Sequence, residues 1–364
     1  MAASASLPTP SAPVLAGAHR KLADRVGDPL LRGLTTLATL VGVLALGALV
    51  YKVFDLAGEA FSHFGLSFVT SSEWNPVHNQ FGAADFLFGT AVTSFGALLI
   101  AGPVSVAIAL FLTELAPRRV RRPVATLVEL LAAIPSVVLG FWGIIVLAPA
   151  MSETIEPALS SVLGWIPLFS GTPAGFGLLP AIAILTIMTV PIVSSVTRDV
   201  FATVPTELKE GAFALGATRW EMVRMVILPY ARSGMVGALI LGLGRALGEA
   251  IAVTMVIGHT PQITASLFGT GDTLASRIAS EYQGATTTLQ ISSLAYLAAI
   301  LLVLALIANA LARLIVRRTG LRERSPSSGS PTAPAATPTA PVTSPSGALP
   351  TPGAIWPAPG DGAS

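Results

Sequence analysis

Arg245 and Glu249 are the residues whose types and positions point most directly to chemistry. They stand in GLGRALGEA, residues 242–250, inside an apolar run from Gly234 to Gly258. Such a run is long enough to cross a bilayer, where an arginine at the helix centre costs about 2.5–3.5 kcal/mol on insertion scales. Its guanidinium keeps its proton at any working pH and offers a planar fork of donors that suits an oxyanion. We therefore interpret Arg245 as a candidate anion-binding group.

Glu249 follows Arg245 by one helical turn, so we expect both side chains on the same face of one helix. One interpretation is an ion pair that locks this helix to a neighbour, with Gly244 and Gly248 allowing close approach. The other is that both side chains line a polar path, where the carboxylate repels a doubly charged anion and so permits its release. We favour the polar path, because an arginine fits a role in which the charge must never be lost.

Hydroxyl side chains in other apolar runs are secondary candidates for a polar path. Serine and threonine in membrane helices often bond their own backbone or a neighbouring helix, so a purely structural role competes with this one. The candidates are Thr90, Ser94, Ser136 and Thr254.

The composition indicates a membrane protein. The 364 residues are 52% hydrophobic and 11% charged, with a mean hydropathy of +0.74, whereas about a quarter of the residues are charged in a soluble domain. The absence of cysteine excludes disulfides and thiolate chemistry, and four scattered histidines predict no metal site. A net charge of +2 is too small to predict nucleic-acid binding.

Six apolar runs are each near or above the ~20 residues that a membrane helix needs. Backbone groups in lipid must be satisfied within the chain, so we predict an all-α polytopic membrane protein. All but three of the 21 basic residues flank these runs on one side, which by the positive-inside rule places both termini in the cytoplasm. The predicted spans are about 34–54, 86–113, 124–150, 176–197, 234–258 and 289–315, which together form a permease domain over residues 34–318.

The two ends of the chain and the loops on the side opposite the basic residues predict no specific chemistry. Residues 1–33 and 319–364 are expected to be mostly disordered cytoplasmic segments, the latter because it is rich in Pro, Ala, Ser and Thr. Asp272, Glu281 and Trp74 fall in the loops opposite the basic ones, where we interpret them as loop charges and part of an interfacial aromatic belt.

The cytoplasmic loop 198–233 has a pattern of its own. After Pro205, TELKEGAFALGA predicts a short helix that Gly216 ends, and WEMVRMVIL predicts a second amphipathic segment that Pro229 stops. Two short helices at the membrane surface are therefore expected. None of the three lysines follows a phosphate-binding glycine loop, so ATP hydrolysis is expected on another chain.

This loop resembles the EAA loop of ABC-importer permeases. Gly211 stands where that pattern has alanine, and Val226 stands where it has isoleucine. The resemblance implies the fold of an ABC type I importer permease and a coupling helix that docks on an ATPase subunit. The matching residues are Glu210, Gly211, Ala212, Gly216, Leu228 and Pro229.

Four further stretches are similar to the PstC family, the permease subunits of phosphate-specific ABC importers: residues 64–90, 129–143, 241–258 and 273–281. The resemblance implies that Arg245 and Glu249 serve the passage of phosphate. It also implies a PstA-like sister permease, a PstB-like ATPase dimer that holds ATP and Mg, and a PstS-like phosphate-binding protein outside a bacterial cytoplasmic membrane. No cofactor is expected on this chain, and membrane lipid is its remaining partner. The alternatives are a permease for sulfate or molybdate, a secondary transporter and, from another class, an intramembrane enzyme.

Overall fold

The computed structural model describes residues 22–319 of the chain. The predictions of disorder for residues 1–21 and 320–364 lie outside the described residues. The first helix, α1 (Leu22–Phe64), begins earlier than the apolar run at residue 34, so the segment 22–33 is helical rather than disordered.

Within residues 22–319, six helical stretches are long and apolar enough to cross a membrane. Apart from one small hairpin the described elements are helices, so the prediction of an all-α polytopic fold is confirmed. The stretches are Pro29–Phe64, Ala84–Leu115, Ser136–Leu163, Leu178–Ala202, Arg219–Gly248 and Thr288–Leu314.

Between the first two stretches lie a short helix, α2 (Ser67–Thr70), and an antiparallel hairpin of β1 (Trp74–Asn75) and β2 (Gln80–Phe81). The second stretch is α3 (Ala84–Leu110), which continues into the π-helical turn η1 (Phe111–Leu115). Helix α3 runs through Pro103 without ending there.

The third stretch differs from the prediction. Residues 118–132 form a separate amphipathic helix, α4 (Arg118–Ala132), and Pro135 then precedes a new helix, so the stretch begins at Ser136 and not near residue 124. Proline disfavours a helical conformation in the residue before it, which accounts for the break. The stretch consists of α5 (Ser136–Trp142), η2 (Gly143–Leu147), α6 (Ala148–Ala150), η3 (Met151–Ile155) and α7 (Glu156–Leu163), followed by η4 (Pro167–Phe169).

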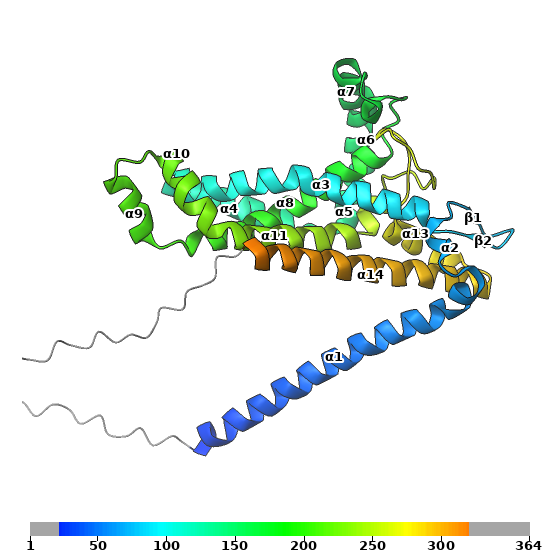
Figure 1. Cartoon of the computed structure of the whole chain (residues 1–364), viewed down its shortest axis with the longest axis horizontal. Coiled ribbons are helices and arrows are strands. Elements are labelled where there is room, and N and C mark those ends of the chain that lie inside the picture. The colour runs from blue at the N-terminus through cyan, green and yellow to red at the C-terminus, as the bar shows by residue number, and fades with distance from the viewer. Residues whose placement is uncertain (1–21, 320–364) are drawn as a thin grey trace, which may run out of the picture. The chain divides into compact units, whose positions relative to one another are not determined.

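The remaining helices complete the bundle. They are α8 (Leu178–Ala202), α9 (Thr206–Ala214), α10 (Arg219–Met222), η5 (Val223–Ile227), α11 (Leu228–Gly248), α12 (Ile251–Thr254), α13 (Leu274–Glu281), η6 (Tyr282–Gly284) and α14 (Thr288–Thr319). Figure 1 shows α9 and α10 at one end of the bundle and the hairpin with α13 at the other. We call these the α9 end and the hairpin end.

Three groups of buried apolar side chains hold the bundle. The central group joins α3, α5, α8 and α12, and it includes Ile184 and Val256, which both lie close to Gly143. The group at the hairpin end is aromatic: Phe68 stacks on Tyr296 with ring centroids 4.5 Å apart. The group at the α9 end packs Phe201 against Met222 and Ile227. Helix α1 joins the bundle only through its C-terminal half, which contacts α14, and its N-terminal half stands apart with exposed leucines (Figure 1).

Candidate functional site

Arg245 lies in the last turn of α11 on the outer face of this chain. Among residues 29–314, whose side chains the structure describes, it has no partner in an ion pair or a side-chain hydrogen bond. Gly244 and Gly248 are exposed beside it, and a Cβ built on either of them would meet no atom within 4 Å. The guanidinium therefore faces away from the core of the chain.

Glu249 does not share a helix with Arg245. Helix α11 ends at Gly248, and Glu249 adopts an extended conformation with φ −72° and ψ 116°. Its Oε1 accepts a hydrogen bond of 3.3 Å from the backbone N–H of Ala252, at the start of α12. The expectation of a single span to residue 258 with both side chains on one face is therefore wrong.

Close packing of α12 on α5 accounts for this break. A Cβ on Gly140 of α5 would lie 2.6 Å from the sulfur of Met255 and 3.1 Å from the Cα of Ala252. The chain after Gly248 must turn out of the α11 axis to reach this contact. Non-helical backbone at membrane depth is tolerated where protein buries it, and Ala252 and Val253 are buried here.

The secondary hydroxyl candidates are dispersed. Thr90 is buried, donates to the Phe86 carbonyl at 2.7 Å and accepts from the Leu274 backbone N–H at 2.9 Å, so it ties α3 to α13. Ser94 is buried and its hydroxyl has no partner among the described residues.

Thr254 donates to the Ala250 carbonyl at 2.6 Å, and Ser136 is the half-buried first residue of α5. No hydrogen bond between described residues joins any of the four candidates to Arg245.

Helix α9 confirms the prediction of a short helix after Pro205 that Gly216 ends. Helix α9 ends at Ala214, and Gly216 adopts φ +84°, a left-handed conformation that favours glycine. The N–H of Ala217 bonds the Ala212 carbonyl at 3.1 Å, which closes the helix end. Glu210 and Gly211 are exposed on α9, beside a groove of about 590 Å³ between α9 and the turn η5.

The second helix of this region differs from the prediction. Thr218 and Glu221 form a reciprocal capping box that starts α10, and the helix then continues through η5 into α11. Pro229 does not stop it, because η5 is a π-helical turn in which the N–H of Leu228 bonds the Val223 carbonyl. Proline lacks an N–H and is tolerated in the turn that follows such a bulge. Residues 219–248 are thus one continuous stretch.

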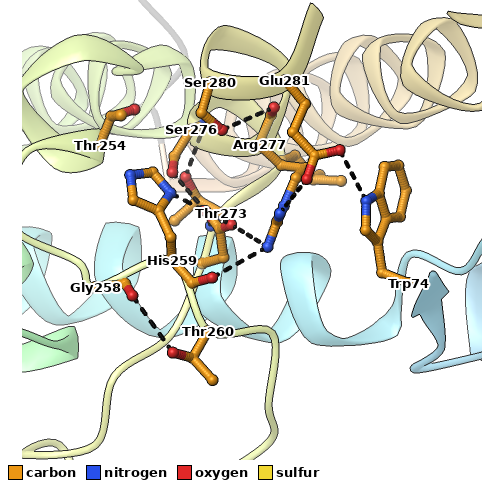
Figure 2. A network of polar contacts seen from close by, with 12 residues as sticks. Trp74, Thr254, Gly258, His259, Thr260, Thr273, Ser276, Arg277, Ser280 and Glu281 are labelled. Atoms are coloured by element: carbon orange, nitrogen blue, oxygen red, sulfur yellow. Dashed lines mark hydrogen bonds and ion pairs between the residues drawn. The ribbon is translucent and has the colours of Figure 1, made fainter. Parts of the chain in front are cut away.

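The structure contains a polar network that the sequence analysis missed. Asp272 Oδ2 lies 2.8 Å from Arg277 Nη2, and Arg277 Nη1 donates to Glu281 Oε1 at 2.5 Å. Trp74 Nε1 donates to the second oxygen of Glu281 at 2.9 Å. Figure 2 shows Arg277 and Glu281 of α13, Trp74 of the hairpin and His259 of the loop after α12 converging on one place.

The network is enclosed by apolar and aromatic groups. The Asp272 side chain is 0% exposed and that of Arg277 is 8% exposed. The guanidinium carbon lies 4.9 Å from the centroid of the Phe86 ring, and Ser276 Oγ donates to Asp272 Oδ1 at 2.5 Å. The four-residue spacing of Arg277 and Glu281 was the one signal in the sequence, since such pairs meet on a helix face.

His259 lies at the open edge of this network. Its backbone has φ +53°, and its Nδ1 is 3.7 Å from Asp272 Oδ2. Hydrogen bonding to the Asp272 carboxylate raises the pKa of His259; partial burial opposes the rise, attraction to that carboxylate adds to it, and the charge of Arg277 lowers it.

Comparison with known proteins identifies the family. Residues 103–321 match the family described as the inner membrane component of binding-protein-dependent transport systems. The chain belongs to this family. It is 45% identical over 299 residues to the phosphate transport system permease protein PstC of Mesorhizobium japonicum, covering 81% of this chain and 91% of that protein.

Further relatives of this family carry the same name. The PstC of Xylella fastidiosa strain 9a5c is 44% identical over 308 residues, covering 84% of this chain and 95% of that one. PstC 2 of Mycobacterium tuberculosis is 44% identical over 257 residues, covering 68% and 79%. The fold is also that of a solved permease in a bacterial alginate ABC transporter, with a TM-score of 0.54, 22% identity and coverage of 81% and 98%.

The family match includes the α9 region and both charged residues of the Gly234–Gly258 run. It also includes the network residues Asp272, Arg277 and Glu281, but not Trp74 or Thr90, which precede residue 103. The predictions of an ABC type I importer permease fold and of a multi-pass membrane protein are confirmed.

Proposed function

We propose that this chain is the transmembrane permease subunit of a phosphate ABC importer and forms part of the path for inorganic phosphate. ATP hydrolysis would take place on a separate chain. Relatives named as phosphate permeases that are 44–45% identical over most of the chain support this proposal. The structural observation that carries it is the guanidinium of Arg245, which is exposed in an apolar helix and has no side-chain partner within residues 29–314.

A permanent charge on the outer face of a membrane helix needs a polar environment from outside the chain. Contact of such a charge with lipid tails is unfavourable, by about 2.5–3.5 kcal/mol or more where it lies at the centre of a membrane helix. A sister permease that closes over this face of α11 would leave Arg245 beside a water-filled path. The open space at Gly237, Gly244 and Gly248 allows a neighbouring helix to approach closely.

The chemistry of the path follows from the two charges. Arg245 offers five N–H donors in a fork that matches two phosphate oxygens, and it replaces part of the water that the anion loses. Glu249 stands just beyond the end of α11, where its second oxygen is not used by the hydrogen bond to Ala252. A carboxylate there would weaken anion binding and favour release.

The partners of the proposed importer are a PstA-like sister permease, a PstB-like ATPase dimer with its ATP and Mg, and a PstS-like phosphate-binding protein. In this assignment the α9 end faces the cytoplasm, because α4 places Arg118, Arg119 and Arg121 there. Both termini are then cytoplasmic, and the exposed residues Glu210 and Gly211 of α9 face the ATPase.

Transport by the assembled complex tests the proposal. The chain is co-expressed with PstA-like, PstB-like and PstS-like chains of the same genome, and uptake of labelled phosphate and sulfate is measured in proteoliposomes that contain ATP. We expect ATP-dependent uptake of phosphate. Arg245→Ala and Arg245→Lys should lower uptake by about tenfold or more, since each removes the bidentate fork.

Lys52→Ala is the matched control, because Lys52 pairs with Asp55 in an exposed contact far along the sequence from Arg245. Uptake of this variant should equal that of the unmodified complex. Full phosphate uptake by Arg245→Ala would exclude Arg245 from the path, and uptake of sulfate in place of phosphate would overturn the choice of substrate.

A further inference from the structure

Lys209 and Glu114 form an ion pair between the helix α9 and the end of α3. Lys209 Nζ donates to Glu114 Oε1 at 2.6 Å, and the two side chains are 18% and 15% exposed. Glu114 belongs to η1, the π-helical turn that prolongs α3. By contrast, the pair of Arg198 and Glu129 at the same end has a carboxylate that is 57% exposed. The Lys209 pair is therefore the better shielded of the two.

Helix α9 has few other attachments to the bundle. None of its residues is fully buried, and Ala212 packs on the group of buried side chains around Phe201 and Met222. The exposed side chains of α9 are accessible to a partner chain. They are Glu207, Leu208 and Glu210. Lys209 and Ala212 are three residues apart, so they lie on the same face of the helix and attach it to the rest of the chain.

A cavity separates the rest of α9 from η1. It has a volume of about 420 Å³ and is lined by Leu110, Glu114, Leu115, Phe213, Arg219, Trp220, Met222 and Val223. Because Phe213 faces η1 across this space, tight apolar packing does not hold the two elements together here. The ion pair of Lys209 and Glu114 bridges the two elements beside the cavity.

The second membrane stretch carries this attachment to the far end of the chain. Helix α3 and η1 are continuous from Ala84 to Leu115. At the hairpin end, Thr90 of α3 bonds the backbone of Leu274, and Gly89 packs directly on Asp272. A displacement of η1 along the α3 axis would therefore reach the polar network at the opposite end.

We propose that the ion pair of Lys209 and Glu114 transmits the movement of α9 to the second membrane stretch. This inference rests on the proposed function, in which an ATPase moves α9. Both residues are positioning residues, since neither touches the transported anion in this assignment. Separation of the pair is unfavourable, because each charge would remain poorly solvated and without a partner. We therefore expect α9 and η1 to move together.

A double-mutant cycle in the reconstituted complex tests this role. The variants are Lys209→Ala, Glu114→Ala, the double alanine variant, and the charge exchange Lys209→Glu with Glu114→Lys. The measured quantity is phosphate taken up per ATP hydrolysed, with co-purification of the ATPase recorded for each variant. We expect the single variants to lower this ratio by about tenfold while the ATPase still co-purifies and hydrolyses ATP.

The double alanine variant should be no worse than either single variant, and the charge exchange should restore the ratio at least in part. Glu129→Gln is the control, because it removes the more exposed ion pair at the same end, and its ratio should stay within about twofold of the unmodified complex. Additive losses in the cycle, an unchanged ratio in Lys209→Ala, or an equal loss in the control would overturn the inference.

The two proposals fail in different ways. A complex of unmodified chains that takes up no phosphate contradicts the proposed function. Normal uptake by that complex, with an unchanged ratio in Lys209→Ala, contradicts only the role of the ion pair. If the single variants do not assemble with the other subunits, the charge-exchange variant provides the test. Its assembly with a restored ratio of phosphate to ATP supports the role of the ion pair, and its failure to assemble overturns that role.

Discussion

Asp272 and Arg277 form a buried ion pair, with 2.8 Å between Oδ2 and Nη2, at the hairpin end of the chain. The pair joins the loop after α12 to α13, and the guanidinium carbon of Arg277 lies 4.9 Å from the centroid of the Phe86 ring of α3. A segment that reads as a polar loop is therefore built as an interior, in which Arg277 pairs with both Asp272 and Glu281. Among the described residues, Asp272 Oδ2 and Arg277 Nε still have no hydrogen-bond partner. This end of the chain is held by specific contacts between groups far apart in the sequence.

Removal of the guanidinium should destabilise the fold. Arg277→Met keeps an apolar stem of similar length but leaves Asp272 buried without its partner, which we expect to lower the free energy of unfolding by about 3–5 kcal/mol. The measurement is reversible unfolding of the purified chain in mixed detergent micelles. Lys52→Met removes an exposed pair and should change the same quantity by about 1 kcal/mol or less. Equal effects of the two variants would show that the network adds no stability.

Gly89 should tolerate no side chain. A Cβ at this position would lie 1.9 Å from the backbone oxygen of Asp272, so Gly89→Ala must push α3 away from the network. We expect a loss of about 1–3 kcal/mol in the free energy of unfolding, as in other overpacked sites. Gly58→Ala, at an exposed position in the C-terminal part of α1, is the comparison variant and should be neutral or stabilising. A stable Gly89→Ala variant would contradict the close approach.

The protonation of His259 should make the stability of the hairpin end depend on pH. The ordinary pKa of 6.5 is raised in the folded chain, first by hydrogen bonding to Asp272, so folding favours the protonated form. The resulting stabilisation is fully present below about pH 6.5 and is lost as the pH rises through the raised pKa.

Melting temperatures of the purified chain across this pH window provide the measurement. The unmodified chain should lose more stability between about pH 6 and 8 than His259→Gln, which cannot take up the proton. Parallel curves for the two proteins would show that His259 does not contribute to the pH dependence.

Gly216 should be required for the end of α9. Its φ of +84° disfavours residues with a Cβ, by about 1–2 kcal/mol for a left-handed conformation. No described atom lies within 4 Å of a Cβ built there, so a side chain at this position would cause backbone strain but no steric clash. We expect Gly216→Val to reduce co-purification of the ATPase and uptake of phosphate, whereas the helical and open Gly58→Ala should leave both unchanged. Full co-purification with Gly216→Val would contradict this role.

The sequence alone determined the elements that follow from local physics. Apolar runs predict membrane helices because each helix must satisfy its own backbone in lipid, and Gly216 ends α9 because its own conformation favours glycine. The family was also visible in short motifs, since Glu210, Gly216 and Pro229 keep their spacing in the EAA-like loop. These signals need no knowledge of what packs against them.

Tertiary structure decided the rest, because it depends on contacts between distant segments. The break at Glu249 arises from the packing of α12 on Gly140, which no periodicity within the run reveals. The network of Asp272 and Arg277 needed Trp74 and His259 to be brought beside α13 from other parts of the chain. The exposure of Arg245 is likewise a property of the folded surface: hydropathy shows that a charge lies in an apolar helix, and only packing shows which way it faces.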